Sequence, residues 1–378
     1  MHRLQFHYTL SRDSSPALVR NPLMDLLQAV SSAGSISAGA RQLGLSYRHV
    51  WGELKRWENE LGNELVVWEK GQSARLTEFG AKLMWAERQA QARLAPQIEA
   101  LRGDLERAFA VAFDANAHVV TLYASHDDAL TALREHALGP SQLHLDIRFC
   151  GSVDAIRGLN EGRCVMAGFH TLQHPAPGSL AERVYKPLLQ PGLHKIIGFA
   201  QRTQGLMVAA GNPLQLQSLQ DVQQRKARFI NRALGTGTRV VFDELMAQQG
   251  LAPSDIQGFE RTEPSHTAAA SGVASGAADV GLGIEVAARA QGLDFVPLVQ
   301  ENYHLVCLKS ALDDPAIVAL CAVLQSAEWQ HQMGSIAGYT PSHCGEVLSL
   351  RAVLPWWSFS RQKVRAKVQD TLAEHSGN

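Results

Sequence analysis

Residues 34–57, GSISAGARQLGLSYRHVWGELKRW, constrain the fold more than any other stretch of the chain. Small and apolar side chains predict one short helix, Gly44 ends it, and Ser46 can cap a second helix. The second helix has an apolar stripe at three-to-four spacing, formed by Val50, Leu54 and Trp57. Polar and aromatic side chains lie opposite this stripe. The pattern predicts either a DNA-reading helix-turn-helix or an ordinary pair of packed helices.

The next segment, ELVVWEKGQSARLTEFG at residues 64–80, favours the DNA-binding alternative. An apolar, β-prone run is followed by a turn at residues 71–72, a second short strand at 74–76, and a helix capped by Thr77. This order predicts a β-hairpin wing beside the two helices. Lys70 and Arg75 would then lie along the phosphate backbone while the second helix reads base edges.

The motifs GSIS-x-GA, Ser46-Tyr47, Trp51 and LTEFG, in this order, resemble the winged helix-turn-helix of ModE-type molybdate-responsive regulators and of LysR-type regulators. The resemblance covers about the first hundred residues and implies double-stranded operator DNA as a partner. Sequence would be read by Ser46, Tyr47 and Arg48, with Trp51 as a further candidate. The complete set expected at DNA is Ser35, Ser37, Arg41, Ser46, Tyr47, Arg48, Trp51, Lys55, Lys70 and Arg75.

Charge and cysteine content limit the other partners. The formal net charge is −1, so attraction to DNA must come from a local patch, and residues 41–56 carry a surplus of cations. The five scattered cysteines form no C-x-x-C pair and indicate reduced thiols of a cytoplasmic protein. No apolar run approaches the length of a membrane span, and we expect neither export nor membrane insertion.

Residues 79–113 follow one long helical pattern after the wing. Steps of four and three along it form the apolar stripe Leu94, Ile98, Leu101 and Leu105. Pro96 should kink this helix. The stripe either packs against a second copy of the chain, as in LysR-type regulators, or faces the chain's own core. A homodimer or homotetramer would match a pseudo-palindromic operator.

From about residue 116 the pattern changes to alternating strands and helices, which predicts an α/β domain of two lobes. Expected strands are 118–124, 144–149, 165–169, 193–200, 205–209, 228–231, 258–261, 278–282, 294–297 and 301–308, with helices at 127–138, 153–160, 239–249 and 267–275. We therefore divide the chain into a winged helix-turn-helix at 1–80, a linker helix at 81–115, a two-lobed domain at 116–345 with its second lobe at about 203–300, and a tail at 346–378.

The segments ASHD, GSVDAIRGLNEGRCVMAGFH, NRALGTGTR, PSHTAAASGVASGAADVGLGIEVAA and LDFVPLVQENYHLV resemble the periplasmic-binding-protein-like domain that occurs fused to such helix-turn-helix segments. Relatives of that domain are also fused to molybdopterin-biosynthesis proteins. The resemblance covers roughly residues 118–310. It implies a small effector bound between two lobes and directs the choice of ligand toward molybdenum metabolism.

The residues themselves predict an anion site. In residues 231–239, glycines expose backbone N–H groups, threonines add hydroxyls and an arginine adds charge, all at a helix N-terminus. Helix starts at Ser125, Gly151-Ser152 and Ser265 could converge on the same oxyanion, and Tyr303 could close over it. The full set of candidate ligand-binding residues is Ser125, His126, Gly151, Ser152, His170, Asn231, Arg232, Gly235, Thr236, Gly237, Thr238, Arg239, Ser265, His266 and Tyr303.

Each of these features has a second interpretation. The serines and threonines could only cap helices, and Arg239 could pair with Asp243 one turn along its helix. Asp127 and Asp128 would repel an anion and more plausibly cap their own helix. His126, His170 and His174 lack a fourth metal ligand at a recognisable spacing, so we assign no metal site. No catalytic motif is present, and we expect neither an enzyme nor a cofactor.

The sequence therefore predicts a DNA-binding transcription regulator controlled by molybdate, tungstate or a molybdenum-cofactor-related anion. Formate or another small carboxylate is the alternative ligand. A different class of function also remains open: an anion- or cofactor-binding module of molybdenum-cofactor metabolism that uses its first domain for protein contacts.

Overall fold

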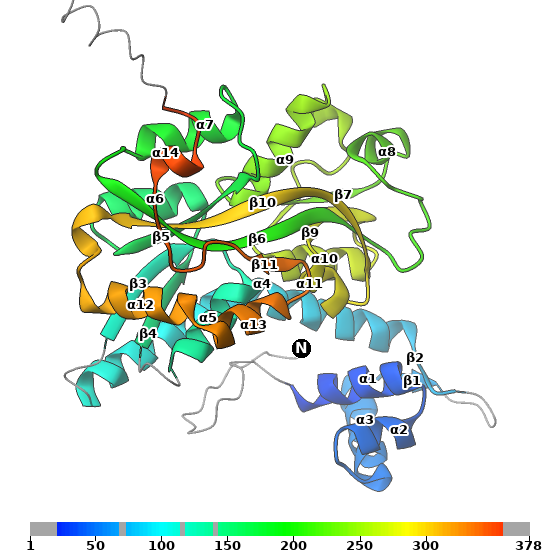
Figure 1. Ribbon diagram of the computed structural model, residues 1–378. Coiled ribbons are helices and arrows are strands. Elements are labelled where there is room, and N and C mark those ends of the chain that lie inside the picture. Colours follow the sequence, from blue (N-terminus) through cyan, green and yellow to red (C-terminus); the bar gives the residue numbers. More distant parts are fainter. Residues whose placement is uncertain (1–20, 68–72, 114–117, 139–142, 358–378) are drawn as a thin grey trace, which may run out of the picture.

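A computed structural model describes residues 21–67, 73–113, 118–138 and 143–357 of the chain (Figure 1). Its N-terminal domain consists of α1 (Pro22–Ala33), α2 (Ile36–Gln42), α3 (Tyr47–Leu61), β1 (Val66–Val67) and β2 (Arg75–Leu76). The wing turn predicted at 71–72 and Lys70 lie outside the described residues.

Local sequence accounts for the ends of these helices. Asn21 accepts a hydrogen bond from the backbone N–H of Leu23 at the start of α1. Gly34 ends α1 with a φ of 65°, a left-handed conformation that glycine adopts without a steric penalty. The two short strands pair antiparallel, with Val66 opposite Leu76, and form the predicted wing. The α1–α3 helices close on a core that includes Leu27, Val30, Val50 and Leu54.

Helix α4 (Glu78–Phe113) follows the wing and confirms the predicted long helix. Thr77 accepts a hydrogen bond from the backbone N–H of Gly80 and caps its start, as predicted. Of the predicted stripe, Leu94, Leu101 and Leu105 are 39%, 58% and 39% exposed, so these side chains do not face the chain's own core. Pro96 lies inside the helix, and a kink at this position stays a prediction.

The remaining chain forms a two-lobed α/β domain, as predicted. Among the described residues, ten strands form one sheet in the order β4-β3-β5-β10-β6-β9-β7-β8, with β11 and β12 also pairing with β6. Its strands are β3 (His118–Ala124), β4 (Leu143–Phe149), β5 (Met166–Leu172), β6 (His194–Val208), β7 (Phe229–Arg232), β8 (Thr262–Glu263), β9 (Val280–Ile284), β10 (Asp294–Leu308), β11 (Tyr339–Pro341) and β12 (Val347–Ser349).

Two strands belong to both lobes. The sequence predicted a break between strands 193–200 and 205–209, but these residues form one continuous strand, β6. It also predicted a break between strands 294–297 and 301–308, but these form one continuous strand, β10. Both predicted breaks are wrong. The two strands pair antiparallel over almost their whole length. The pairing register shifts twice, between Pro297 and Val299 and between Tyr303 and His304. Their continuity carries the sheet from the first lobe into the second (Figure 1).

Helices cover both faces of this sheet. They are α5 (Asp128–Leu138), α6 (Ser152–Asn160), α7 (Leu180–Tyr185), α8 (Leu219–Gln224), α9 (Gly237–Gln248), α10 (His266–Ala274), α11 (Glu285–Ala290), α12 (Pro315–Gln325), α13 (Ala327–Gly334) and α14 (Leu350–Val353). The strand expected at 258–261 is replaced by β8, because Gly258, with a φ of 90°, packs closely against the backbone of Phe229.

The first lobe continues past the boundary predicted at residue 345. Strand β12 pairs with β6, and Leu350, Leu354 and Trp356 join the core around α6 and α7. The part of the predicted tail up to residue 357 therefore packs on the first lobe. Its basic segment beyond that residue lies outside the described residues.

Candidate functional site

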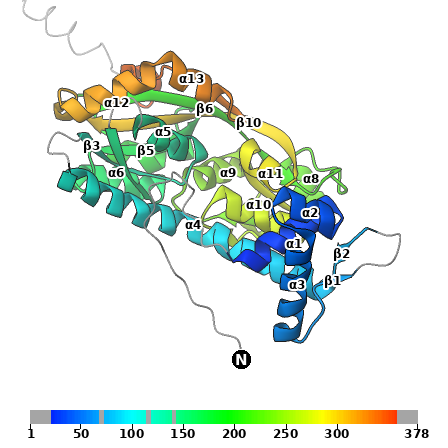
Figure 2. The ribbon, with the colours of Figure 1, turned by 90° about the horizontal axis from the view of Figure 1, so that it is seen from below.

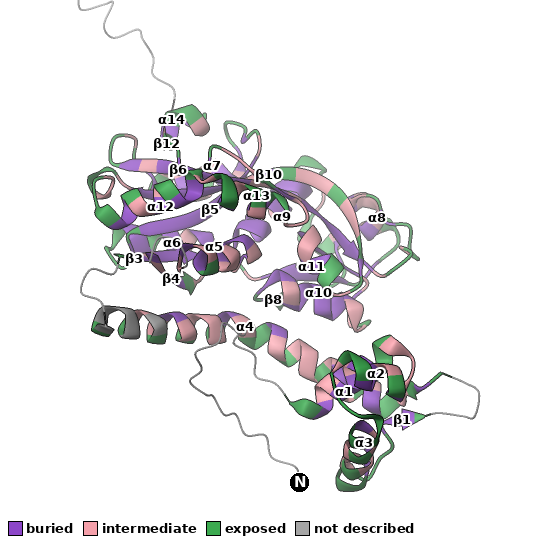
Figure 3. Cartoon of the chain, turned by 60° about the horizontal axis from the view of Figure 1, so that its bottom comes forward, coloured by how far each residue is buried: buried purple, intermediate pink, exposed green. Residues whose placement is uncertain are grey.

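The exposed face of α3 carries the residues predicted to read DNA. Val50 and Leu54 point into the core, whereas Tyr47 is 48% exposed and Arg48 is also exposed. Figure 3 shows α3 at the end of the molecule furthest from the sheet, with much of its surface exposed. This position leaves the side of α3 that carries Tyr47 and Arg48 open to solvent, as a helix that reads DNA requires.

Glu58 is a buried carboxylate that fixes α3 against the wing. Its Oε1 accepts hydrogen bonds from the backbone N–H groups of Leu65 (2.9 Å) and Val66 (3.3 Å), and its Oε2 accepts one from Lys55 Nζ (2.6 Å). Burial raises the pKa of Glu58, but the bonds from Lys55 and the two backbone groups lower it overall. The sequence analysis missed this residue, since its i, i+3 spacing from Lys55 is also that of a surface ion pair.

Several predicted DNA contacts already have partners within the chain. Ser35 caps α2 and Ser46 caps α3, accepting hydrogen bonds from backbone N–H groups three residues ahead. Lys55 lies between Glu58 and the ring of Trp51, 4.9 Å from the ring centroid. Ser37, Arg41 and Arg75 are exposed.

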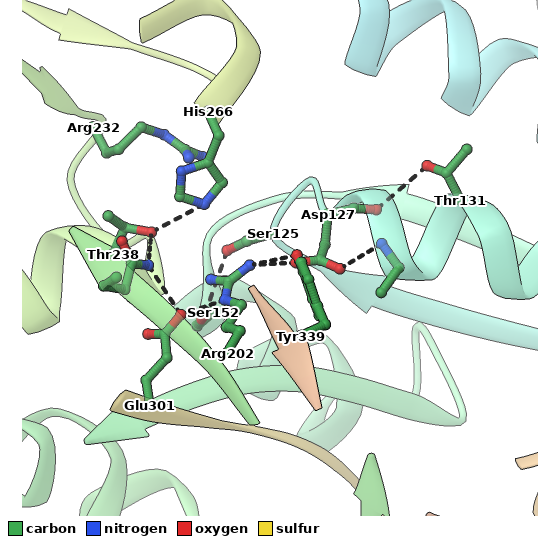
Figure 4. Close-up of polar contacts among 12 residues, drawn as sticks. Ser125, Asp127, Thr131, Ser152, Arg202, Arg232, Thr238, His266, Glu301 and Tyr339 are labelled. Atoms are coloured by element: carbon green, nitrogen blue, oxygen red, sulfur yellow. Dashed lines mark hydrogen bonds and ion pairs between the residues drawn. The ribbon is translucent and has the colours of Figure 1, made fainter. Parts of the chain in front are cut away.

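A second set of polar side chains lies between the two lobes (Figure 4). From the first lobe come Ser125, after β3, and Ser152, at the start of α6, whose hydroxyl oxygens are 3.4 Å apart. From the second lobe comes Thr238, at the start of α9. Its hydroxyl accepts from Gln204 Nε2 (3.0 Å) and lies 3.3 Å from Nε2 of His266. All these side chains are buried.

Arg232 is the charged member of this cluster and is 1% exposed. Its Nη2 donates to the carbonyl oxygen of Pro264 at 3.0 Å, whereas Nε and Nη1 have no hydrogen-bond partner among the described residues. Burial, with the nearby charge of Arg202, lowers the pKa of Arg232 from 12.5 to about 9. Within the same region, His170 stacks on Tyr303, with ring centroids 4.0 Å apart, and neither ring nitrogen of His170 has a described partner.

A buried ion network next to the cluster was missed by the sequence analysis. Arg202 on β6 pairs with both Asp127 and Glu301, and Tyr339 Oη donates to Asp127 Oδ2 at 2.7 Å. Asp127 also caps α5, accepting from the backbone N–H of Ala129, as predicted. With both carboxylates ionised, Arg202, Asp127 and Glu301 together carry one net negative charge, so this network supplies no net attraction to an anion and leaves that role to Arg232.

Some predicted ligand-binding residues have other contacts. Arg239 pairs with Asp243 at 2.8 Å, which was the second interpretation. Asn231 donates to the carbonyl of Phe259, and Thr236 and Ser265 cap α9 and α10. His126 packs on Phe149, and burial lowers its pKa from 6.5 to about 4.

The two lobes touch through glycines. A Cβ added to Gly151 in the first lobe would lie 2.7 Å from the carbonyl oxygen of Gly235 in the second. A Cβ added to Gly237 would lie 2.4 Å from Nδ1 of His170. These contacts are possible only without side chains and bring the two lobes together, an arrangement that we call closed.

Two family models match the chain. The PBP superfamily domain matches residues 133–325, just over half of the 378 residues. The chain belongs to this superfamily. A second model, the bacterial regulatory helix-turn-helix protein of the lysR family, matches residues 23–81. The two matches identify a LysR-type DNA-binding transcription regulator with a PBP-like effector domain.

Two further proteins are similar in sequence to part of the chain. Uncharacterized protein YvgK of Bacillus subtilis (strain 168) is 31% identical over 221 residues, 58% of this chain and 70% of YvgK. A Clostridium pasteurianum protein from the 5′ region of a ferredoxin 2Fe-2S gene is 32% identical over 111 residues, 29% of this chain and 98% of that protein.

Solved structures similar to this chain include ArgP from Mycobacterium tuberculosis, with 20% identity, a TM-score of 0.36 and coverage of 80% of this chain and 95% of ArgP. Another is LysG from Corynebacterium glutamicum with bound effector Arg, with 15% identity, a TM-score of 0.38 and coverage of 80% and 96%. At these TM-scores the superpositions are loose.

Two features are absent from the described part of the chain. None of their helices combines the length and apolar character needed to cross a membrane. Within the same residues, no three histidine, cysteine or acidic side chains are grouped in a way that could hold a metal ion.

Proposed function

We propose that this regulator responds to a small anion bound between its lobes, with Arg232 as the charge partner. The observation that carries the proposal is a guanidinium buried in the protein with two N–H-bearing nitrogens, Nε and Nη1, that lack a described partner. A buried charged group whose N–H groups lack hydrogen-bond partners is costly, and an anion bound to Nε or Nη1 would reduce that cost. The hydroxyls of Ser125, Ser152 and Thr238 would supply neutral donors from both lobes.

Molybdate, tungstate or a molybdenum-cofactor-related anion is our first choice of ligand. Donors that reach the site from opposite lobes suit a tetrahedral oxyanion, which presents acceptor oxygens in every direction. Formate or another small carboxylate is the second choice. It is favoured because a carboxylate oxygen could accept from the N–H group of Nε or of Nη1 of Arg232, neither of which has a described partner.

The anion would control DNA binding by closing the lobes. A ligand that contacts both Ser152 and Thr238 binds the closed arrangement better than an open one and shifts the population toward it. We further propose that the exposed leucines of α4 join two copies of the chain into a homodimer or homotetramer in the cytoplasm. Two α3 helices would then read the halves of one operator, with Arg48 and Tyr47 at base edges.

Thermal unfolding with a panel of molybdate, tungstate, sulfate, phosphate and formate tests the ligand. An anion at about 100 times its Kd adds about 2.7 kcal/mol of stability, which corresponds to roughly 5–10 °C in a domain of this size. We expect one anion of the panel to raise the Tm of the wild-type protein and not of the Arg232→Met variant. Equal shifts in both proteins would place the anion elsewhere.

A gel shift on the DNA upstream of the protein's own gene separates the regulator from the alternative class. The exposed α3 predicts retardation at a defined site. A module of molybdenum-cofactor metabolism without DNA binding would leave the duplex unshifted at every protein concentration.

A further inference from the structure

The linker helix α4 is held by both lobes of its own chain. Its first half contacts the second lobe, where Nε and Nη2 of Arg93 donate to the two carboxylate oxygens of Glu263 at 2.8 and 2.5 Å. Glu263 is 2% exposed, whereas Arg93 is half exposed. Beside this pair, the hydroxyl of Ser265 donates to the backbone carbonyl of Ala92 at 3.2 Å.

The second half of α4 contacts the first lobe. Arg134, a buried residue of α5, pairs with Glu99 and also reaches its backbone carbonyl at 3.5 Å. Further along the helix, Arg107 lies 3.3 Å from Asp146 of β4. Figure 2 shows α4 running along the underside of the two-lobed domain, from the second lobe to the first.

The four residues 263–266 join the first half of α4 to the polar cluster between the lobes. Glu263 and Ser265 hold the helix, as described above. Between them, the carbonyl of Pro264 accepts from Nη2 of Arg232, and the next residue, His266, lies beside the hydroxyl of Thr238. Within this segment, Glu263 and Ser265 therefore contact α4, whereas Pro264 and His266 contact residues of the proposed anion site.

We propose that residues 263–266 transmit lobe movement to α4, with Arg93 and Glu263 as the positioning residues. One continuous helix bonded to two lobes cannot keep all its contacts when the lobes separate, so it must shift with one lobe or lose its bonds to the other. Leu101 and its neighbouring leucines are exposed on this helix, so a shift of α4 moves the surface that we expect to face a second copy. Lobe closure thereby changes the spacing of the two α3 helices.

This inference rests on the proposed function, but its test uses no ligand, so the two can fail separately. Gly151→Ala separates the lobes, because its Cβ would lie 2.7 Å from the backbone oxygen of Gly235. The backbone of Gly151 has φ −65° and ψ 150°, which alanine adopts freely, so the substitution adds only contacts with the backbone of Gly235 and Thr236 in the second lobe. Glu263→Gln keeps the shape of the side chain and removes its charge.

Four full-length proteins are compared: wild type, Gly151→Ala, Glu263→Gln and the double variant. Amide hydrogen exchange across α4 is measured by mass spectrometry, together with affinity for the upstream DNA. We expect Gly151→Ala to change α4 protection and to change DNA affinity by a factor within about 5–150, the usual range of allosteric coupling. On the Glu263→Gln background, the same substitution should leave α4 protection unchanged and DNA affinity within about twofold.

The matched control is Asp279→Asn. It removes a bidentate ion pair with Arg228 in the second lobe that does not involve α4, and it should leave the effect of Gly151→Ala intact. If Glu263→Gln fails to fold, Arg93→Gln is used instead, because it removes the same Arg93–Glu263 ion pair by changing the more exposed residue. Equal effects of Gly151→Ala with and without the Arg93–Glu263 pair would overturn the inference, and so would unchanged protection of α4 in the Gly151→Ala single variant.

Discussion

Replacing Arg232 by methionine should stabilise the ligand-free protein while it abolishes the anion response. Burial lowers the pKa of Arg232 from 12.5 to about 9. Below about pH 9 the side chain is charged in the folded and unfolded states alike, so the full penalty of burying the charge is present at neutral pH. At about 1.4 kcal/mol per pH unit, the difference corresponds to a penalty of at most about 5 kcal/mol.

The net gain should be smaller than this upper value. Methionine also loses the hydrogen bond to the carbonyl of Pro264, a loss of about 1 kcal/mol. Apolar replacements of buried charged groups have been stabilising by about 1–4 kcal/mol. We therefore expect a gain of about 1–3 kcal/mol in the free energy of unfolding, which corresponds to a rise in Tm of roughly 2–12 °C.

The assay is calorimetric unfolding of the full chain with and without the anion identified in the panel. Arg239→Met is the matched control, because Arg239 is also a buried arginine near the start of α9 but pairs with Asp243. It should lower the Tm and keep the anion-induced shift. The reasoning is refuted if Arg232→Met lowers the Tm as much as the control does, or if its anion-induced shift equals that of wild type.

Other predictions concern the DNA-binding domain and the pH dependence of stability. Arg48→Ala should reduce discrimination between operator and random duplex by about 1–3 kcal/mol per lost base contact, whereas substitution of the exposed Arg41 by alanine should weaken both duplexes alike and reduce the salt slope by about 1, both by fluorescence anisotropy. Glu58→Ala leaves two buried backbone N–H groups unpaired and should destabilise the N-terminal domain by about 1–3 kcal/mol in urea unfolding, while exposed Glu60→Ala should have no effect. Burial lowers the pKa of His304 from 6.5 to about 3. As the pH falls from about 6.5 to about 3, the His304 imidazole therefore takes up a proton in the unfolded state but not in the folded state. Stability should fall by up to about 1.4 kcal/mol per pH unit from this group, and His304→Gln should make the decline measurably shallower in Tm scans from pH 7 to 4.

The sequence was informative where structure depends on local chemistry. The helix-turn-helix, its cap at Ser46 and the wing could be predicted because each depends on neighbouring residues. The segment 231–239 was correctly identified as a strand, a loop and a helix start, and it brings Arg232 and Thr238 into the polar cluster.

Features that depend on distant pairing could not be predicted. Arg202 and Gln204 lie in the polar run QRTQG, which has no apolar pattern and therefore suggested a break between two strands. Only the antiparallel pairing of β6 with β10 places Arg202 opposite Glu301. Similarly, a serine at the start of a helix can either cap that helix or bind a ligand, and the sequence does not distinguish the two roles. Only the fold shows that the hydroxyl of Ser265 donates to the backbone carbonyl of Ala92 in α4.

The most direct test of the account is a titration of the upstream operator DNA with the wild-type protein and the Arg232→Met variant, with and without the anion that raises the wild-type Tm. The account predicts that this anion changes the operator affinity of wild type by a factor within about 5–150 and leaves that of Arg232→Met unchanged. An identical anion effect in both proteins, or none in wild type, would contradict control of this regulator by an anion at Arg232.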